Sequence, residues 1–248
     1  MNRDPRKDRA RKRRLRPFFS FYGGKWRDAP RLYPAPTRTR IIEPFAGSAG
    51  YSLRYPDADV TLCDIDPGIA GLWRYLIRVS PAEVRRLPDF GDADTVDDLG
   101  VCQEARTLIG FWLNRGSSSS RKRPSRWMRE GVRPGSFWGE RVRETIASQV
   151  DAIKHWRIIE GSYEQCPNLD ATWFVDPPYQ GAGRHYRYGS DQIDFERLGE
   201  WCRARQGQVI ACEAQGATWL PFRPIASTKT TRKGKRSAEA MWTADSAA

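Results

Sequence analysis

The chain has 248 residues, with 42 Lys and Arg against 30 Asp and Glu, which gives a formal net charge of +12. This length fits one large α/β domain with a smaller inserted region. The basic balance predicts a polyanionic partner, with nucleic acid ahead of an anionic membrane. No apolar run approaches the length of a membrane span, and the N-terminus lacks a signal-peptide core. We therefore expect an intracellular protein.

The cysteines and histidines give no sign of a metal centre. The five cysteines show no Cys-x-x-Cys spacing, and the chain has only two histidines. A zinc site is therefore not expected, and disulfides are not expected in a reducing cell. We predict no metal cofactor.

The first 16 residues form a basic segment. They include nine Lys and Arg and almost nothing apolar, so we predict a disordered tail. Such a tail either binds the phosphates of a nucleic acid without sequence preference or serves only to keep the chain soluble.

Aromatic residues and two glycines follow, in Phe21-Tyr22-Gly23-Gly24-Lys25. Paired glycines let a backbone bend or approach a ligand closely, and Lys25 is long enough to reach a carboxylate or phosphate.

A short apolar strand is predicted over residues 40–43, followed by the small-residue turn Pro44-Phe45-Ala46-Gly47-Ser48-Ala49-Gly50 and a helical pattern from about Tyr51. Such a turn places unpaired backbone donors and a helix N-terminus at the carboxyl end of the strand. It is neither the Gly-x-Gly-x-x-Gly of dinucleotide enzymes nor a P-loop. NAD and ATP are therefore not the first choice of ligand.

A second strand, residues 60–64, ends in the acid Asp64 about twenty residues after Glu43. An acid at that distance in a nucleoside-binding βαβ unit accepts hydrogen bonds from ribose hydroxyls. The alternative for Asp64 is the N-cap of the helix that runs to Arg78. Asp66, directly before Pro67, fits the cap better, which leaves Asp64 for ribose.

Residues 81–156 interrupt the strand–helix alternation with helix-like segments around a centre rich in Gly, Ser and Arg. Its arginine-dominated charge and interleaved aromatics favour a loop that orders on nucleic acid over a plain surface linker. The cationic side chains expected to contact DNA here are Arg115, Arg121, Lys122, Arg123, Arg126 and Arg129.

After a strand near residues 156–163, the apolar run 172–175 ends abruptly in Asp176-Pro177-Pro178-Tyr179. Ligands of open α/β sheets bind beyond the carboxyl ends of the strands. A carboxylate, a fixed backbone and an aromatic face thus coincide where a site is favoured. The alternative is a strand that simply leaves through a proline turn.

The remaining chain predicts a glycine-rich loop over 180–190, a helix over about 192–205, a buried strand over 208–213, and a hairpin formed by 225–231 and 238–243. The loop fits a lid or strand clamp beside the site. Its Arg184 and Tyr186, and Lys233 and Lys235 of the hairpin turn, are predicted to contact DNA.

The motifs Phe21–Lys25, Glu43–Gly50, Cys63–Asp66 and Asp176–Tyr179 occur together in this order. From about Pro17 to Thr243 the chain resembles Dam-like DNA adenine methyltransferases, the α group of exocyclic-amine methyltransferases. The resemblance implies an α/β fold with a doubly wound, mostly parallel, seven-stranded Rossmann-like sheet and a C-terminal antiparallel hairpin. Residues 17–80 and 157–248 would form the catalytic domain, with a mainly helical target-recognition insert over 81–156.

The activity implied by the resemblance is methyl transfer from S-adenosyl-L-methionine to the 6-amino group of a flipped adenine in double-stranded DNA. Asp176 and the main-chain carbonyl of Pro177 would accept the amine hydrogens, Pro178 would stiffen the backbone, and Tyr179 would stack on the base. Ser162 stands where relatives often carry an acid. The cofactor-binding residues would be Phe21, Tyr22, Lys25, Glu43, Pro44, Phe45, Gly47, Gly50, Asp64, Ile65, Ser162, Tyr163 and Asp176. Lys25 is also expected to contact DNA.

Three alternatives stay open. Cytosine 4-amino methyltransferases share the tetrapeptide, RNA adenine methyltransferases more often begin it with Asn, and a non-catalytic DNA-binding relative is disfavoured by the intact motifs. We expect a monomer or weak dimer that does not bind membranes. The resemblance implies a cytoplasmic, nucleoid-associated protein, bacterial or phage-encoded, as in restriction–modification. All of this requires Asp176 to face a cavity that it shares with Asp64.

Overall fold

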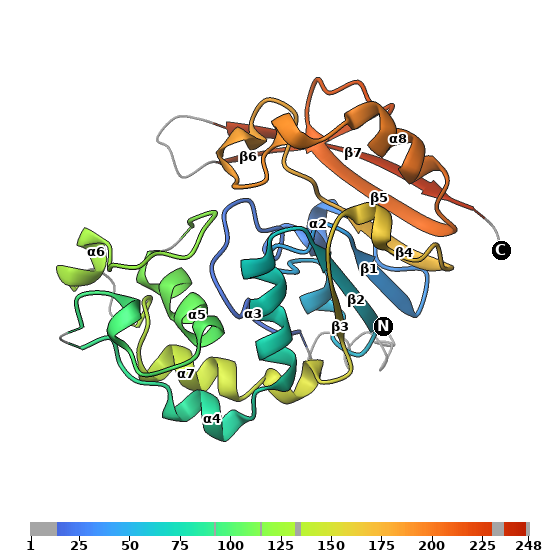
Figure 1. Cartoon of the computed structure of the whole chain (residues 1–248). Coiled ribbons are helices and arrows are strands. Elements are labelled where there is room, and N and C mark those ends of the chain that lie inside the picture. Colours follow the sequence, from blue (N-terminus) through green and yellow to red (C-terminus); the bar gives the residue numbers. More distant parts are fainter. Residues whose placement is uncertain (1–13, 92, 115, 132–134, 230–235, 247–248) are drawn as a thin grey trace, which may run out of the picture.

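The computed structural model describes residues 14–91, 93–114, 116–131, 135–229 and 236–246, and a seven-stranded sheet lies at their centre (Figure 1). The strands are β1 Arg40–Glu43, β2 Asp59–Asp64, β3 Arg157–Glu160, β4 Ala171–Val175, β5 Gly207–Ala214, β6 Arg223–Lys229 and β7 Arg236–Asp245. Their order is β3-β2-β1-β4-β5-β7-β6. β1 to β5 pair in parallel, and β7 runs antiparallel to both of its neighbours. The predicted fold class is confirmed.

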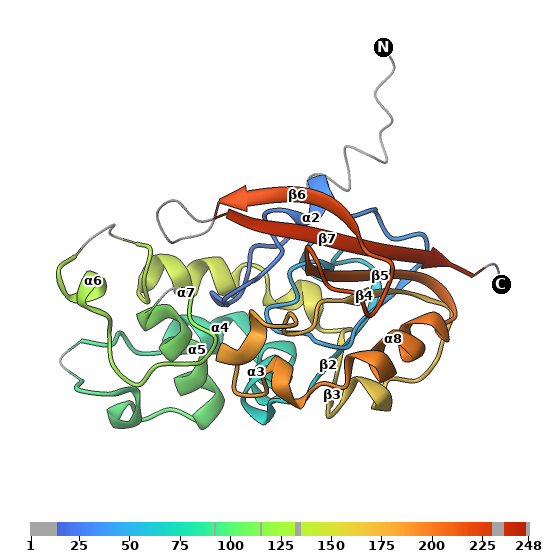
Figure 2. The ribbon, with the colours of Figure 1, turned by 90° about the horizontal axis from the view of Figure 1, so that it is seen from above.

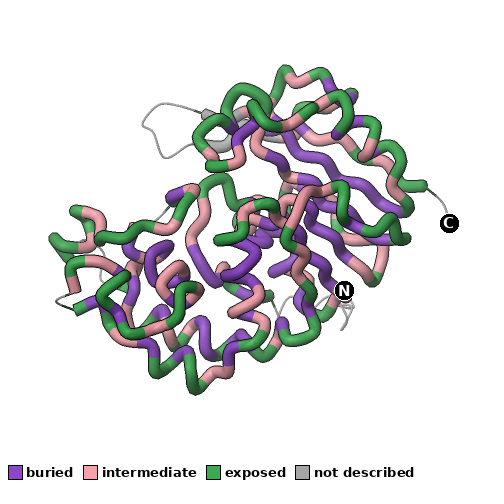
Figure 3. The backbone as a smooth tube through the Cα atoms, viewed as in Figure 1, coloured by how far each residue is buried: buried purple, intermediate pink, exposed green. Residues whose placement is uncertain are grey.

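The sheet is buried on both faces because its apolar strands direct alternate side chains to opposite sides. In β4, Phe174 joins the core that contains α3 (Pro67–Arg78), whereas Trp173 and Val175 join the core that contains α8 (Phe195–Arg203). Figure 3 shows the strands as the buried centre. Helices on both faces make the sheet doubly wound. No helix in the described part of the chain is long and apolar enough to cross a membrane.

The connection from β1 to β2 differs from the prediction. The helix expected from about Tyr51 is a single 3₁₀ turn, Ser52–Arg54, followed by Tyr55 with φ −131° and ψ 55°. Tyr55 precedes Pro56, and the residue before a proline is disfavoured in helical conformation. The predicted helix is therefore wrong, and the small-residue turn ends in a tight bend instead of a helix N-terminus.

The insert is mainly helical, as predicted, and lies between α3 and β3. Its elements are α4 Pro81–Arg86, η2 Val96–Asp98, α5 Gln103–Leu113, α6 Arg126–Arg129, α7 Glu140–Ala147 and η3 Val150–Ile153. The ring centroid of Phe111 in α5 lies 5.0 Å from that of Phe19, in the same core as α3. Figures 1 and 2 show α4, α5 and α7 packed beside α3. The insert thus extends the core of the sheet and does not fold around one of its own.

The packed chain begins before Pro17. Leu15 is buried and its amide donates to the carbonyl of Leu53 at 2.9 Å. The main chain of Arg16 exchanges hydrogen bonds with the side chain of Gln149. The boundary predicted at residue 16 is therefore too late, and residues 1–13 lie outside the described part.

α2, Ala29–Leu32, is a short helix that follows the Gly-Gly-Lys segment, and three further 3₁₀ turns border the site. They are η4 Tyr163–Gln165, η5 Gly183–His185 and η6 Ser190–Gln192. The predicted hairpin is present as β6 and β7, while most of its basic turn, with Lys233 and Lys235, lies outside the described residues.

Candidate active site

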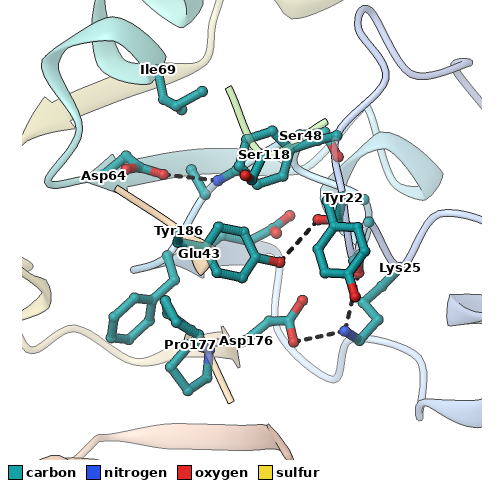
Figure 4. A pocket seen from close by; sticks show the side chains of 18 of the residues that line it. Tyr22, Lys25, Glu43, Ser48, Asp64, Ile69, Ser118, Asp176, Pro177 and Tyr186 are labelled. Atoms are coloured by element: carbon teal, nitrogen blue, oxygen red, sulfur yellow. Dashed lines mark hydrogen bonds and ion pairs between the residues drawn. The ribbon is translucent and has the colours of Figure 1, made fainter. Parts of the chain in front are cut away.

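One cavity of about 1,400 Å³ opens at the carboxyl ends of β1, β2 and β4, and Figure 4 shows it from close by. It is lined by Glu43, Asp64 and Asp176, each of which ends or directly follows one of these strands. Sites for single small ligands usually measure about 300–1,000 Å³. The cavity therefore has room for two ligands side by side, and the required sharing of one cavity by Asp64 and Asp176 is met.

The turn after β1 is held in a conformation that suits small residues. Gly47 and Ala49 have positive φ angles of 44° and 50°. A side chain at Gly47 would touch the Phe21 ring, and one at Gly50 would meet the main-chain nitrogens of Trp26 and Lys25 at 2.7 and 2.9 Å. The glycines thus bring the Phe21–Lys25 segment onto the turn.

Asp64 binds that turn through main-chain donors. Its Oδ2 accepts from the amide of Gly47 at 2.9 Å and its Oδ1 from the amide of Asp66 at 3.0 Å. Burial raises the pKa of Asp64 to about 6, although both amides oppose the shift. A carboxylate has about four acceptor positions, so two remain for ligand hydroxyls. Asp66 caps α3 by accepting from Gly68, which confirms the predicted cap, while the ribose contact of Asp64 stays a prediction.

An aromatic pair forms one wall beside Asp64. The rings of Phe45 and Tyr163 stack with centroids 5.5 Å apart, and Ile65 is 47% exposed at the cavity. Ser162 accepts from the amide of Glu164 and so caps η4. The aromatic pair and Ile65 thus place flat apolar surface along this wall of the cavity.

Glu43 is buried below the turn and lines the cavity beside Pro44. Its Oε1 accepts from the amide of Ser52 at 2.7 Å. Burial raises the pKa of Glu43 to about 8, and the bonds from Ser52 oppose this only in part. The side chain therefore holds a proton near neutral pH and supports the bend that replaces the predicted helix.

Asp176 is paired with Lys25 inside the cavity. Lys25 Nζ lies 3.0 Å from Oδ1 of Asp176, and the two side chains are only 10% and 19% exposed. Oδ1 of Asp176 is itself buried, so Lys25 is its charged partner inside the protein. Burial raises the pKa of Asp176 while Lys25 opposes that rise. Burial lowers the pKa of Lys25, but Asp176 and Glu239 outweigh it and keep the ammonium charged.

Lys25 therefore lines the cavity beside Asp176, and its predicted DNA contact stays a prediction. It neutralises the carboxylate that the reaction would use. Oδ1 of Asp176 is buried against Lys25, while the Asp176 side chain as a whole lines the cavity.

Tyr179 is engaged at both its hydroxyl and its ring. The hydroxyl donates to Glu239 Oε2 at 2.6 Å, and Lys25 Nζ lies 4.6 Å from the ring centroid. Lys25 covers one ring face, so the predicted stacking on a base depends on the other.

Tyr186 lies inside the cavity and not among the exposed cations, and its predicted DNA contact stays a prediction. Its hydroxyl donates to the carbonyl of Tyr22 at 3.1 Å, and its ring packs 5.9 Å from Phe21. Gly23 makes this position possible, because a Cβ there would lie 2.7 Å from the Tyr186 hydroxyl. Arg184, two residues earlier, is exposed.

The described cations of the insert that are predicted to contact DNA lie on its surface, and the insert itself borders the cavity at Ser118. The rim contact is made by Ser117, whose carbonyl accepts from Tyr22, and by Ser118, which donates to the carbonyl of His185. Arg121, Lys122, Arg123, Arg126 and Arg129 are all exposed, and Arg115 lies outside the described residues.

Two acids of the site were missed by the sequence reasoning. Glu239 contacts Tyr179 from β7, and the buried Glu213 at the end of β5 accepts from the amide of Gln180 at 3.1 Å. Glu213 carries the signal that singled out Asp64 and Asp176, an acid near the end of an apolar strand. Glu239 had a weaker signal, an acid between alanines in an alternating strand. Within the described residues, no three His, Cys, Asp or Glu side chains lie close enough to hold a metal ion.

No protein family and no curated protein matches this chain. Among solved structures, the rRNA methyltransferase AviRa from Streptomyces viridochromogenes is 16% identical over 87% of this chain and 80% of its own, with a TM-score of 0.39. A second structure of the same enzyme is 15% identical over the same shares, also at 0.39. A conserved hypothetical protein of Streptococcus pyogenes is 10% identical over 82% of this chain and 84% of its own, at 0.33. Scores this low carry no inference about function.

Proposed function

We propose that this chain is a DNA methyltransferase that uses S-adenosyl-L-methionine to methylate the 6-amino group of adenine. One observation carries the proposal. The carboxylate of Asp176 shares a single cavity with Asp64 and with the glycine turn after β1. The cavity thus combines a nucleoside-type pocket with an acceptor for an amine.

The residues present fit the cofactor. Asp64 has acceptor positions for the ribose hydroxyls, and Phe45, Ile65 and Tyr163 offer apolar surface for the adenine. The turn from Gly47 to Gly50 would surround the methionine part. When bound, S-adenosylmethionine supplies an electrophilic methyl group on a sulfonium.

The side chains then act on the amine. The Asp176 carboxylate accepts one amine hydrogen and the carbonyl of Pro177 accepts the other, which turns the nitrogen lone pair toward the methyl group. Lys25 keeps the carboxylate ionised and in place. Alignment of two reactants accounts for about 7–11 kcal/mol in the best intramolecular cases, so placement supplies much of the acceleration without a strong base.

Double-stranded DNA is the proposed substrate on electrostatic grounds. The chain carries a net charge of +12, and the insert, which borders the cavity at Ser118, carries exposed arginines. A stacked base cannot enter such a cavity, so the adenine must be flipped out of the duplex.

The test is methyl transfer from labelled S-adenosylmethionine to unmethylated double-stranded DNA, with RNA in a parallel reaction, followed by digestion to nucleosides. We expect label in N6-methyldeoxyadenosine. Label in methylcytosine would show a cytosine 4-amino methyltransferase instead. Label in RNA alone would show that RNA, and not DNA, is the substrate. A protein that is not stabilised thermally by the cofactor and transfers nothing would contradict the proposal.

A further inference from the structure

Glu239 reaches the Asp-Pro-Pro-Tyr segment from the far end of the chain. It lies on β7, lines the cavity and is 9% exposed. Its Oε2 accepts the hydroxyl hydrogen of Tyr179 at 2.6 Å, a short bond of the charge-assisted kind. The C-terminal hairpin therefore contributes a side chain to the site.

Lys25 links this bond to Asp176. Its ammonium lies over the Tyr179 ring at 4.6 Å, 3.0 Å from Asp176 Oδ1, and donates to the carbonyl of Gly23 at 3.1 Å. Figure 4 shows the ammonium between Asp176 and the chain near Tyr22. Glu239, Tyr179, Lys25 and Asp176 thus form a continuous series of contacts, the β7 network.

We propose that Glu239 is a positioning residue for the amine transfer, acting through Tyr179 and Lys25 on the carboxylate of Asp176. Its role in the reaction rests on the proposed function, but its effect on Asp176 belongs to the folded chain alone. Because Tyr179 needs an acceptor and Lys25 needs negative charge nearby, a carboxylate at position 239 satisfies both at once.

The charges of Lys25 and Glu239 shift the pKa of Asp176 in opposite directions. Lys25 lowers the pKa of Asp176, whereas Glu239 raises it. The ionisable groups that interact with Asp176 from the surrounding elements are Lys25, Tyr33, Glu43, Tyr179, Tyr186, Cys212, Glu213 and Glu239. Removing the charge of Glu239 should therefore make Asp176 more acidic, and removing that of Lys25 should make it less acidic.

The test is a carboxyl ¹³C NMR titration of the ligand-free full chain, with the Asp176 signal assigned by its loss in Asp176→Asn. We expect Glu239→Gln to move the midpoint of Asp176 to lower pH and Lys25→Met to move it to higher pH. Glu200→Gln, an exposed change on α8, is the matched control and should leave it unmoved. Thermal unfolding identifies a variant that fails to fold, and Glu239→Met, which also removes the charge, then replaces Glu239→Gln and should move the midpoint in the same direction.

The kinetic arm asks whether the network serves the reaction. We expect Glu239→Gln to lower kcat about tenfold, as for loss of a charged hydrogen bond, with an unchanged KM for S-adenosylmethionine. Because Glu239→Gln makes Asp176 more acidic, it should also move the acid limb of the pH–rate profile to lower pH. Glu239→Asp should recover part of the rate and return this limb toward its wild-type position.

An unmoved midpoint in Glu239→Gln, or a kcat equal to that of Glu200→Gln, would overturn the inference. A wild-type chain that transfers no methyl group would instead overturn the proposed function. The NMR midpoints are read without methyl transfer, so the two failures are distinguishable.

Discussion

The cavity at the strand ends and the outer surface of the insert differ in how firmly their charged side chains are held. In the cavity, Asp64 is held by two main-chain amides, Glu43 by one, and Asp176 by Lys25. In the insert, the described cations that we predict to contact DNA are exposed, and Arg126 pairs with Glu130 while its side chain stays 86% exposed. Exposed pairs contribute little to stability. The fold thus holds the side chains of the cavity more tightly than these surface charges, so under the proposed function mutations should separate rate from affinity.

The largest effect is expected inside the cavity, at Asp176. Asp176→Asn removes the charge that pairs with Lys25 and weakens the acceptor for the amine. We expect methyl transfer to fall by roughly 10²–10³, the usual loss for a preorganised polar group. Cofactor affinity, measured by calorimetry, should change far less.

Asp151→Asn, an exposed change on η3, is the control for this variant and should keep the wild-type rate. If Asp176→Asn retained a rate within a few-fold of wild type, the cavity would not be the place of reaction.

The next effect concerns stability and the proton on Glu43. The folded chain holds this proton up to a pKa of about 8, whereas an unperturbed Glu has a pKa of 4.5. The folded state thus binds more protons between these values, and stability must fall as pH rises through that window. At about 1.4 kcal/mol per pKa unit, the decline amounts to a few kcal/mol.

Glu43→Gln keeps the acceptor for the Ser52 amide and removes the ionisation. Urea unfolding at pH 5 and pH 8 should show a smaller decline in this variant than in wild type. Asp64, whose pKa is raised to about 6, leaves a residual decline in both. An identical decline in the two proteins would show that ionisation of Glu43 does not lower the free energy of unfolding.

A smaller effect is expected at Gly50, where the turn meets the Lys25 segment. A methyl group there would lie 2.7 Å from the nitrogen of Trp26, so the two segments must separate. We expect Gly50→Ala to cost about 1–3 kcal/mol of stability and to weaken cofactor binding. Gly100→Ala is the matched control, because its methyl group meets nothing within 4 Å. Equal cofactor affinity in the two variants would contradict the close packing of the turn.

The smallest effect is expected on the surface of the insert. Arg123→Ala should weaken DNA binding at every sequence and reduce the slope of log affinity against log salt by about 1, as for one lost phosphate contact. The rate at saturating DNA should not change. Arg86→Ala on α4, also exposed, controls for net charge. A loss of rate at saturating DNA would show that this surface shapes the cavity.

The sequence was informative where local chemistry decides the structure. Asp66 before Pro67 predicted the cap of α3, and apolar runs that end in acids predicted β2 and β4 with Asp64 and Asp176 at one edge. The helix after Gly50 was predicted wrongly because Pro56 ends it after one turn.

Local sequence patterns could not predict the contacts between residues far apart in the chain. The pairing of Lys25 with Asp176 joins residues about 150 positions apart, and Glu239 meets Tyr179 only because β7 inserts next to β5. Tyr186 was grouped with surface arginines because nothing in its own segment shows that Gly23 leaves room for its hydroxyl.

The most direct measurement of the central claim is a crystal structure of the chain with S-adenosylhomocysteine. We predict the ribose hydroxyls on Asp64, the adenine against Phe45 and Tyr163, and the sulfur turned toward Asp176. A ligand bound outside this cavity, or one whose sulfur points away from Asp176, would contradict the account.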